Sequence, residues 1–155
     1  MKRAGAALIL ILAFFGLADS AYLAQHALSG TPLLCDIQNF SGCNIVASSK
    51  YSYLFGIPIA ELGVLFYSVL FVLAALEIVV FDQLLRRALQ IIAFVGAAFS
   101  LYFVSVQAFV IGSFCIYCLA SAVIAFLIFI FASFIEPIRK RPRSALPHLQ
   151  MPPSP

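Results

Sequence analysis

Long apolar runs, separated by short polar segments, dominate the chain. Four of them, at about residues 5–27, 57–81, 88–110 and 115–135, are long enough to cross the hydrocarbon core of a bilayer, which takes about 20 residues. The run from Val64 to Val80 is apolar all round, whereas a strand of a membrane barrel alternates apolar and polar positions. The pattern therefore predicts an all-α integral membrane protein, a bundle of four transmembrane helices.

A polar segment at about residues 28–56 separates the first two of these helices. Within this loop, residues 44–50 are expected to form a short interfacial helix, and Phe55-Gly56 leads into the second span. Residues 136–155 hold six of the eight prolines and a basic cluster, which predicts a disordered cytoplasmic tail. Residues 1–135 are therefore expected to form a single membrane domain.

The charge distribution predicts how the bundle lies in the membrane. The chain is 64% hydrophobic and 10% charged, against about 25% charged residues in soluble domains. Basic residues precede the first helix, lie between the second and third, and follow the fourth, whereas Lys50 lies in the other loop. These flanking residues are Lys2, Arg3, Arg86, Arg87, Arg139, Lys140, Arg141 and Arg143. By the positive-inside rule, we expect both termini in the cytoplasm and the 28–56 loop and 111–114 turn outside.

This orientation places all four cysteines, Cys35, Cys43, Cys115 and Cys118, at the outer face. Disulfides persist in a bacterial periplasm or at the cell exterior, so the chain is expected in the bacterial inner membrane. The first 20 residues resemble a secretory signal, but their removal would leave three spans and an external amino terminus; we interpret them as an uncleaved anchor. Nucleic acid is not an expected partner, because the basic tail lacks the pattern of a nucleic-acid-binding surface.

Cys115-Ile116-Tyr117-Cys118 is expected to open the fourth helix. The spacing puts both sulfurs on one helical face, where the free N–H groups and the positive dipole end of a first turn stabilise a thiolate. A stabilised thiolate leaves easily, which makes the corresponding disulfide reactive. The alternative is a pair of buried structural cysteines, since free Cys also packs well in apolar cores.

Cys35 and Cys43 are separated by seven residues of the polar loop. Such a pair can form a disulfide that a passing thiolate attacks, or a staple that holds the loop. A zinc site built from all four cysteines is disfavoured, because zinc-binding pairs usually enclose two to four residues. The expectation is therefore a redox site without a metal.

At these residues the chain resembles the vitamin K epoxide reductase family, in its bacterial disulfide-forming branch. The resemblance rests on Cys35 and Cys43 at the loop spacing, on Ser49 six residues after the second loop cysteine, on Phe55-Gly56, and on Phe114 to Cys118. It covers about residues 5–135, the whole predicted bundle.

The resemblance implies a thiol oxidase in which Cys35, Cys43, Cys115 and Cys118 are catalytic. A reduced, DsbA-like periplasmic protein of the thioredoxin fold would attack the loop disulfide at Cys35 and leave oxidised. Freed Cys43 would attack Cys115, and the released Cys118 thiolate would pass electrons to a membrane quinone, either ubiquinone or menaquinone. As Cys115–Cys118 re-forms, Cys43 would close the loop disulfide with Cys35 again and so support disulfide bond formation.

Six residues are candidates for a quinone pocket. Ser49 would donate a hydrogen bond to a quinone oxygen, and Glu61 would pass protons. The remaining candidates are aromatic residues that would wall the pocket, namely Tyr53, Phe55, Phe114 and Tyr117. The alternatives are a solvated serine, a carboxylate that reaches the interface, and aromatic residues gathered at the membrane surface.

Two features set the chain apart from other members of that family. Ala122 stands where mammalian enzymes have a tyrosine, four residues after the second active-site cysteine, which argues against epoxide reduction. No fused thioredoxin-like domain is expected, so the redox partner is expected to be a separate protein. Two other functions stay open: quinone reduction for vitamin K-type recycling, and a non-catalytic membrane scaffold stapled by disulfides.

Overall fold

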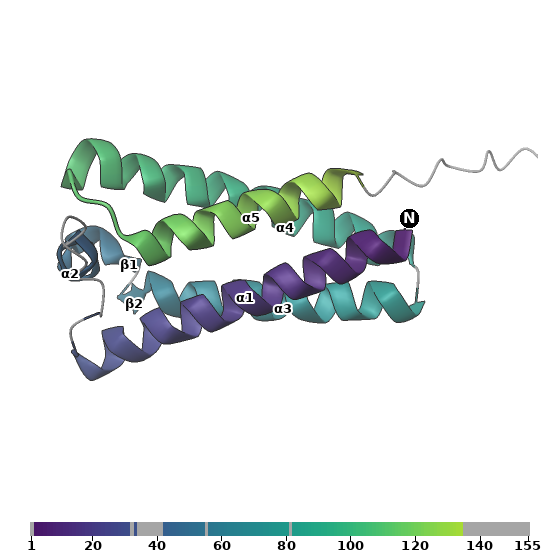
Figure 1. Ribbon diagram of the computed structural model, residues 1–155, viewed down its shortest axis with the longest axis horizontal. Helices are drawn as coiled ribbons and strands as arrows, with labels where there is room; N and C mark the ends of the chain where they lie inside the picture. Colours follow the sequence, from purple (N-terminus) through teal and green to yellow (C-terminus); the bar gives the residue numbers. More distant parts are fainter. Residues whose placement is uncertain (1, 32, 34–41, 55, 81, 135–155) are drawn as a thin grey trace, which may run out of the picture.

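Four long helices run side by side along the molecule (Figure 1). The computed structural model describes residues 2–31, 33, 42–54, 56–80 and 82–134. The long helices are α1 (Lys2–Ser29), α3 (Ile59–Val80), α4 (Gln83–Val106) and α5 (Ile116–Phe134). All four are long and apolar enough to cross a membrane, which confirms the predicted four-helix bundle.

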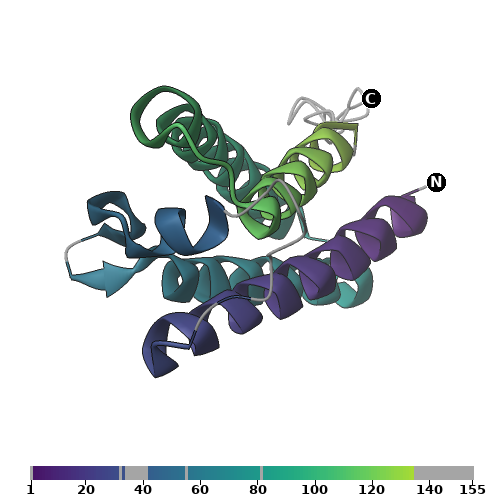
Figure 2. The same ribbon diagram turned by 60° about the vertical axis from the view of Figure 1, so that its left-hand side comes forward.

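Short elements gather at one end of the bundle, as Figures 1 and 2 show. They are α2 (Gly42–Ser48), the 3-10 turn η1 (Lys50–Ser52), β1 (Tyr53–Leu54) and β2 (Ile57–Pro58). The two strands pair antiparallel, and Gly56 supplies the left-handed backbone of the hairpin turn, with φ of 82°. The amino terminus lies at the opposite end (Figure 1). We name the end with the short elements the cysteine end, because α2 carries Cys43.

Helix α2 occupies the place predicted for an interfacial helix, two residues earlier than the expected 44–50. Two neighbouring apolar side chains differ in their surroundings: Val46 is buried and Ile45 is exposed. Cys35, Phe55 and the predicted tail at 136–155 lie outside the described residues.

Small residues allow the helices to approach one another closely. Helix α1 packs mainly against α3 and α5, and α4 packs against α5 and α3. The shared core consists of Ile9, Ala13, Tyr67, Leu70, Ala74, Leu89, Ala93, Ile128 and Ala132. Gly16 leaves room for the ring of Tyr67, whose hydroxyl donates to the Ser121 backbone oxygen at 2.8 Å. In lipid, such close packing and interhelical hydrogen bonds hold a bundle together.

The third span begins at Gln83, five residues before the expected start at residue 88. Asp82 caps it by accepting the Leu84 N–H at 3.2 Å. Arg86, expected in a cytoplasmic turn, is instead buried in α4, where its Nη2 lies 2.6 Å from Oε1 of Glu77 on α3. The hydropathy pattern misplaced the start of α4 because it counts each charged residue separately. The ion pair allows Arg86 and Glu77 to be buried together in the bundle.

Replacing Arg86 should therefore destabilise the bundle strongly. Arg86→Met leaves the Glu77 carboxylate buried without its cation, and breaking a buried ion pair from one side costs about 3–5 kcal/mol. Arg87→Met removes an exposed charge of the same kind from the next position and serves as the control. Thermal unfolding in detergent measures both variants, and equal melting temperatures would contradict a structural role for the ion pair.

Candidate dithiol site

The chain leaves α4 through a widened turn and enters α5 at a cysteine. Residues Gln107–Ile111 form a π-helical turn, which Gly112 ends in the left-handed region with φ of 67°. Cys115 lies immediately before α5, and its carbonyl oxygen accepts the Leu119 N–H at 3.0 Å. Cys115 is thus the N-cap residue of α5, one position outside the helix that the sequence led us to expect.

Cys115 and Cys118 are free thiols, and their environment favours a thiolate on Cys115. The side-chain hydrogen bond from Cys118 lowers the pKa of Cys115 to about 7, with smaller contributions from the backbone N–H groups of Cys118 and Tyr117. Burial of Cys115, which is 1% exposed, opposes this shift in its pKa. The sulfur takes the position of an N-cap oxygen, which also accepts from the second and third residues of its helix.

Cys43 packs against this dithiol from α2. It is disulfide-bonded and fully buried in a cluster with Leu33, Val46 and Cys115. The approach depends on Gly42, because a Cβ atom there would lie 2.5 Å from the Phe114 backbone oxygen. The structure therefore brings together three of the four predicted catalytic cysteines, while Cys35 lies outside the described residues.

A cavity of about 410 Å³ lies in the half of the bundle near the cysteine end. Its lining is mostly apolar and includes Phe66, Phe99 and Phe103, and hydroxyl groups come from Ser20, Tyr67 and Ser121 among others. Cys43, Cys115 and Cys118 do not line this cavity. Ser121 nevertheless follows Cys118 by three residues on α5, so the dithiol and the cavity lie on one helical face.

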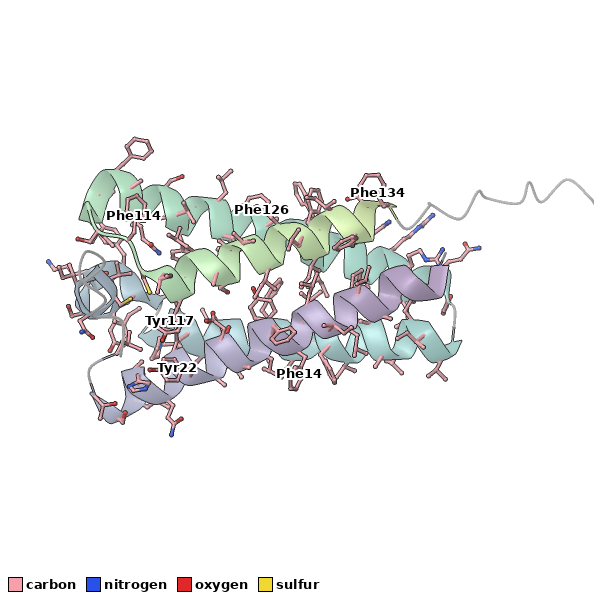
Figure 3. The ribbon with its side chains drawn as sticks, viewed as in Figure 1. Phe14, Tyr22, Phe114, Tyr117, Phe126 and Phe134 are labelled. Atoms are coloured by element: carbon pink, nitrogen blue, oxygen red, sulfur yellow. The ribbon has the colours of Figure 1, made fainter. Side chains whose placement is uncertain are left out.

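The candidate quinone residues fall in different places. Tyr53 lines the cavity of 410 Å³, whereas Ser49 lines a neighbouring cavity of about 60 Å³ and donates its hydroxyl to the Val46 oxygen at 2.7 Å. Tyr117 packs near Cys43 and Cys115, with its ring centroid 5.2 Å from that of Tyr22 on α1 (Figure 3). Through this contact between Tyr22 and Tyr117, α1 also packs against the cluster that contains Cys43 and Cys115.

The two other described candidates lie at the margins. Phe114 is 39% exposed, and its backbone rather than its ring faces Gly42. Glu61 lies in the first turn of α3, and it lines neither cavity. The described candidates therefore do not form one pocket.

Sequence reasoning missed the hydroxyl groups of Ser20, Tyr67 and Ser121 in the cavity, and the buried amide of Gln107. Each is a polar residue in the middle or at the end of an apolar span, a position that marks a functional candidate in membrane proteins. That signal was present in the sequence, but it does not reveal which of these residues meet. In the described part of the chain, no group of three or more His, Cys, Asp or Glu residues is arranged to hold a metal ion.

A four-helix membrane bundle with a dithiol at the start of its last helix defines a narrow class of proteins. The family model of the vitamin K epoxide reductase family matches residues 7–133, and the chain belongs to that family. It is therefore a multi-pass membrane protein. It is similar to the thiol-disulfide oxidoreductase LTO1 of Arabidopsis thaliana, with 32% identity over 118 residues. That alignment covers 72% of this chain and 31% of the plant protein.

The hydrogen bond between the two thiols predicts a specific pH dependence. With both loop cysteines replaced by serine, Cys118→Ala removes the donor, so the pKa of Cys115 should rise from about 7 to about 8.5 or above, the ordinary value for a thiol. Cys118→Ser keeps a hydroxyl donor and should hold the midpoint nearer neutrality. The ultraviolet absorbance of the thiolate against pH measures both. Identical midpoints would show that Cys118 does not stabilise the Cys115 thiolate.

Proposed function

We propose that the chain is a membrane thiol oxidase that passes electrons from a reduced thioredoxin-fold protein to a membrane quinone. The observation that carries the proposal is the packing of disulfide-bonded Cys43 against the free Cys115 thiol in one buried cluster. Thiol–disulfide exchange needs direct contact between sulfurs, and this cluster joins the polar loop to the apolar helix. The family and the similarity to a thiol-disulfide oxidoreductase support the same chemistry.

The reaction begins with the loop. The dithiol of the partner attacks the Cys35–Cys43 disulfide and leaves as a disulfide, so the loop gains two electrons and two protons. Cys43 thiolate then attacks Cys115 of an oxidised Cys115–Cys118 pair, and Cys118 leaves as a thiolate. Cys35 displaces Cys115 from Cys43, which restores the loop disulfide and leaves the α5 dithiol reduced.

The second half of the reaction takes place in the bundle. The Cys115–Cys118 dithiol transfers two electrons and two protons to the quinone, giving a quinol and re-forming the disulfide. The cavity of about 410 Å³ has the size and the apolar lining of a small-molecule site. Its hydroxyl groups are suited to donate to quinone oxygens where negative charge develops. Ubiquinone and menaquinone share this quinone chemistry. Ser49 stays a candidate for a hydrogen bond to a quinone oxygen, and Glu61 stays a candidate for the transfer of protons to the reduced quinone.

The direction of the chain in the membrane is part of this proposal. Arg86 and Arg87 lie near the start of α4, at the end opposite α2, while Lys50 lies at the cysteine end. The positive-inside rule then puts the cysteine end on the periplasmic or exterior side of a bacterial inner membrane. A separate DsbA-like protein would reach the loop there. Anaerobic incubation of the purified protein with a reduced thioredoxin-fold protein and quinone tests the whole reaction, and a folded protein that forms no quinol would refute it.

The exchange step predicts a trapped intermediate. In Cys118→Ser, Cys115 can attack Cys43 of the loop disulfide and free Cys35. Cys118 can no longer compete for Cys115, and only Cys35 can reverse the step, so a Cys43–Cys115 bridge should be populated and preserved by acid quenching. Non-reducing peptide mapping detects that bridge, and Cys115→Ser is the matched control because it cannot form it. A Cys118→Ser protein with an intact loop disulfide and free Cys115 during turnover would exclude this route, as expected for a scaffold stapled by disulfides.

The cavity predicts a separate effect on the quinone. Ser100 on α4 lines it, so Ser100→Phe should fill part of the space and raise the KM for quinone at least about tenfold, which corresponds to ~1.4 kcal/mol. Ser105→Phe, on the same helix but outside the lining, should behave as the unmodified protein. Steady-state quinol formation measures KM, while the yield of the Cys43–Cys115 bridge in a Cys118→Ser background should not change. Equal KM values for the two phenylalanine variants would place the quinone elsewhere.

A further inference from the structure

A hydrogen bond between Leu33 and Asn44 joins the chain that leaves α1 to helix α2. The Leu33 N–H donates to Oδ1 of Asn44 at 2.9 Å, although the two residues are 11 positions apart. Leu33 is buried, and its side chain packs in the cluster of Cys43, Val46 and Cys115. A backbone N–H beside such an apolar cluster needs an acceptor, and the amide of Asn44 supplies it. The side chain that follows Cys43 in the sequence thus connects α2 to the end of α1.

The same chain is also attached to the last turn of α1. The Thr31 hydroxyl lies 2.8 Å from Nδ1 of His26 and 2.8 Å from the hydroxyl of Ser29. These contacts hold the segment after α1 against the helix, two residues before the N–H that Asn44 accepts. We name this set of contacts the tether. It consists of His26, Ser29, Thr31, Leu33 and Asn44.

The end of α1 contacts the dithiol segment as well. The ring centroid of Tyr22 lies 4.4 Å from that of His26 and 5.2 Å from that of Tyr117, the residue before Cys118 (Figure 3). The last turns of α1 therefore touch α5 through Tyr22 and α2 through the tether. The helices that carry the two exchanging sulfurs are positioned against one common helix end.

Other polar side chains of this region bond within α2 and its continuation. The Ser48 hydroxyl donates to the backbone oxygen of Asn44 at 2.8 Å, and the Ser49 hydroxyl donates to that of Val46 at 2.7 Å. The Ser52 hydroxyl donates to the Ala47 oxygen at 2.6 Å. These bonds stabilise the short helix itself, whereas the bond from Leu33 fixes where that helix lies.

We propose that Asn44 is a positioning residue that keeps Cys43 within reach of Cys115 while the loop disulfide is open. The inference rests on the proposed exchange, in which the Cys43 thiolate attacks Cys115, the Cys115–Cys118 bond breaks, and Cys118 leaves with the electron pair of that bond. Once the partner has reduced the loop, its disulfide no longer restrains α2. The tether then maintains the effective concentration of Cys43 at Cys115.

The test is an equilibrium between two sulfurs. A chain with Cys35→Ser and Cys118→Ser retains Cys43 and Cys115, and its equilibration with reduced and oxidised glutathione gives their effective concentration. Acid quenching, alkylation and mass analysis measure the bridged fraction. Asn44→Leu removes the acceptor at similar side-chain volume and should lower the effective concentration about three- to tenfold, the range for one neutral hydrogen bond. Leucine favours helix more than asparagine does, so a weaker α2 would not explain the loss.

Three further variants separate positioning from general damage. Asn44→Asp retains an oxygen for the Leu33 N–H and should keep the unmodified value at a pH well below the ordinary thiol pKa of about 8.5. Ser48→Ala removes a hydrogen bond within the same helix and should also keep it. Thr31→Val breaks the tether at its other link and should lower the effective concentration, so the test does not depend on the folding of one variant.

Circular dichroism in detergent identifies the variants that are folded. An unmodified effective concentration in a folded Asn44→Leu or Thr31→Val protein would overturn the inference. An equal fall in Ser48→Ala or in Asn44→Asp would also overturn it, because the loss would then not follow the acceptor.

Failure of the relay has a different signature. The glutathione equilibrium requires neither the partner nor quinone, so it tests Asn44 even if the unmodified protein forms no quinol and the proposed function fails. If the relay works, Asn44→Leu should slow the release of free Cys118 after one equivalent of reduced thioredoxin-fold protein by about the same factor. This exchange is measured before quinone is added, because Leu33 and Asn44 also line the cavity. Equal rates in Asn44→Leu and the unmodified chain would refute the positioning role.

Discussion

A polar group buried in this bundle can find a partner only within the protein, because the surrounding hydrocarbon offers none. A few interhelical contacts at different depths supply such partners, although one oxygen each of Asp19 and Glu77 is buried without a hydrogen bond. Arg86 and Glu77 join α4 to α3 at one end, and the Tyr67 hydroxyl reaches α5 in the middle. At the cysteine end, Gln107 in the π-helical turn after α4 accepts the Cys115 N–H, which precedes α5. These contacts add to the close packing of helices whose apolar faces have no hydrophobic driving force to leave the lipid.

The same need for partners within the protein applies to the cysteines. A thiolate in an apolar environment needs donors, and Cys115 obtains them from its neighbour Cys118 and from the first turn of α5. Cys43 is brought to this point by a short helix whose first residue is a glycine, so that its backbone lies directly on the chain before Cys115. The loop and the membrane helix thus share one buried cluster, although one belongs to a polar segment and the other to an apolar span.

Hydropathy and cysteine spacing were sufficient to predict the bundle and the dithiol, because both depend on residues close together in the sequence. The start of α4 was misplaced because an arginine taken alone is expected to be exposed to water. Its ion pair with Glu77 of the neighbouring helix is what allows Arg86 to be buried. The amide of Gln107 and the cavity hydroxyls escaped for the same reason. Their roles depend on which helices are neighbours and how each is rotated, and a single sequence without long-range contacts does not contain that information in readable form.

The face that Cys118 and Ser121 share on α5 has a geometric consequence for the choice of acceptor. Three residues of α-helix advance about 4.5 Å along the axis. Helix α5 thus fixes the axial distance between Cys118 and the cavity wall at Ser121. This distance stays the same when the loop moves or the cysteines change redox state. Under the proposed function, an acceptor is selected by the depth at which its ring rests: a ring held one helical turn deeper would fit the same cavity and still lie beyond the reach of the thiolate.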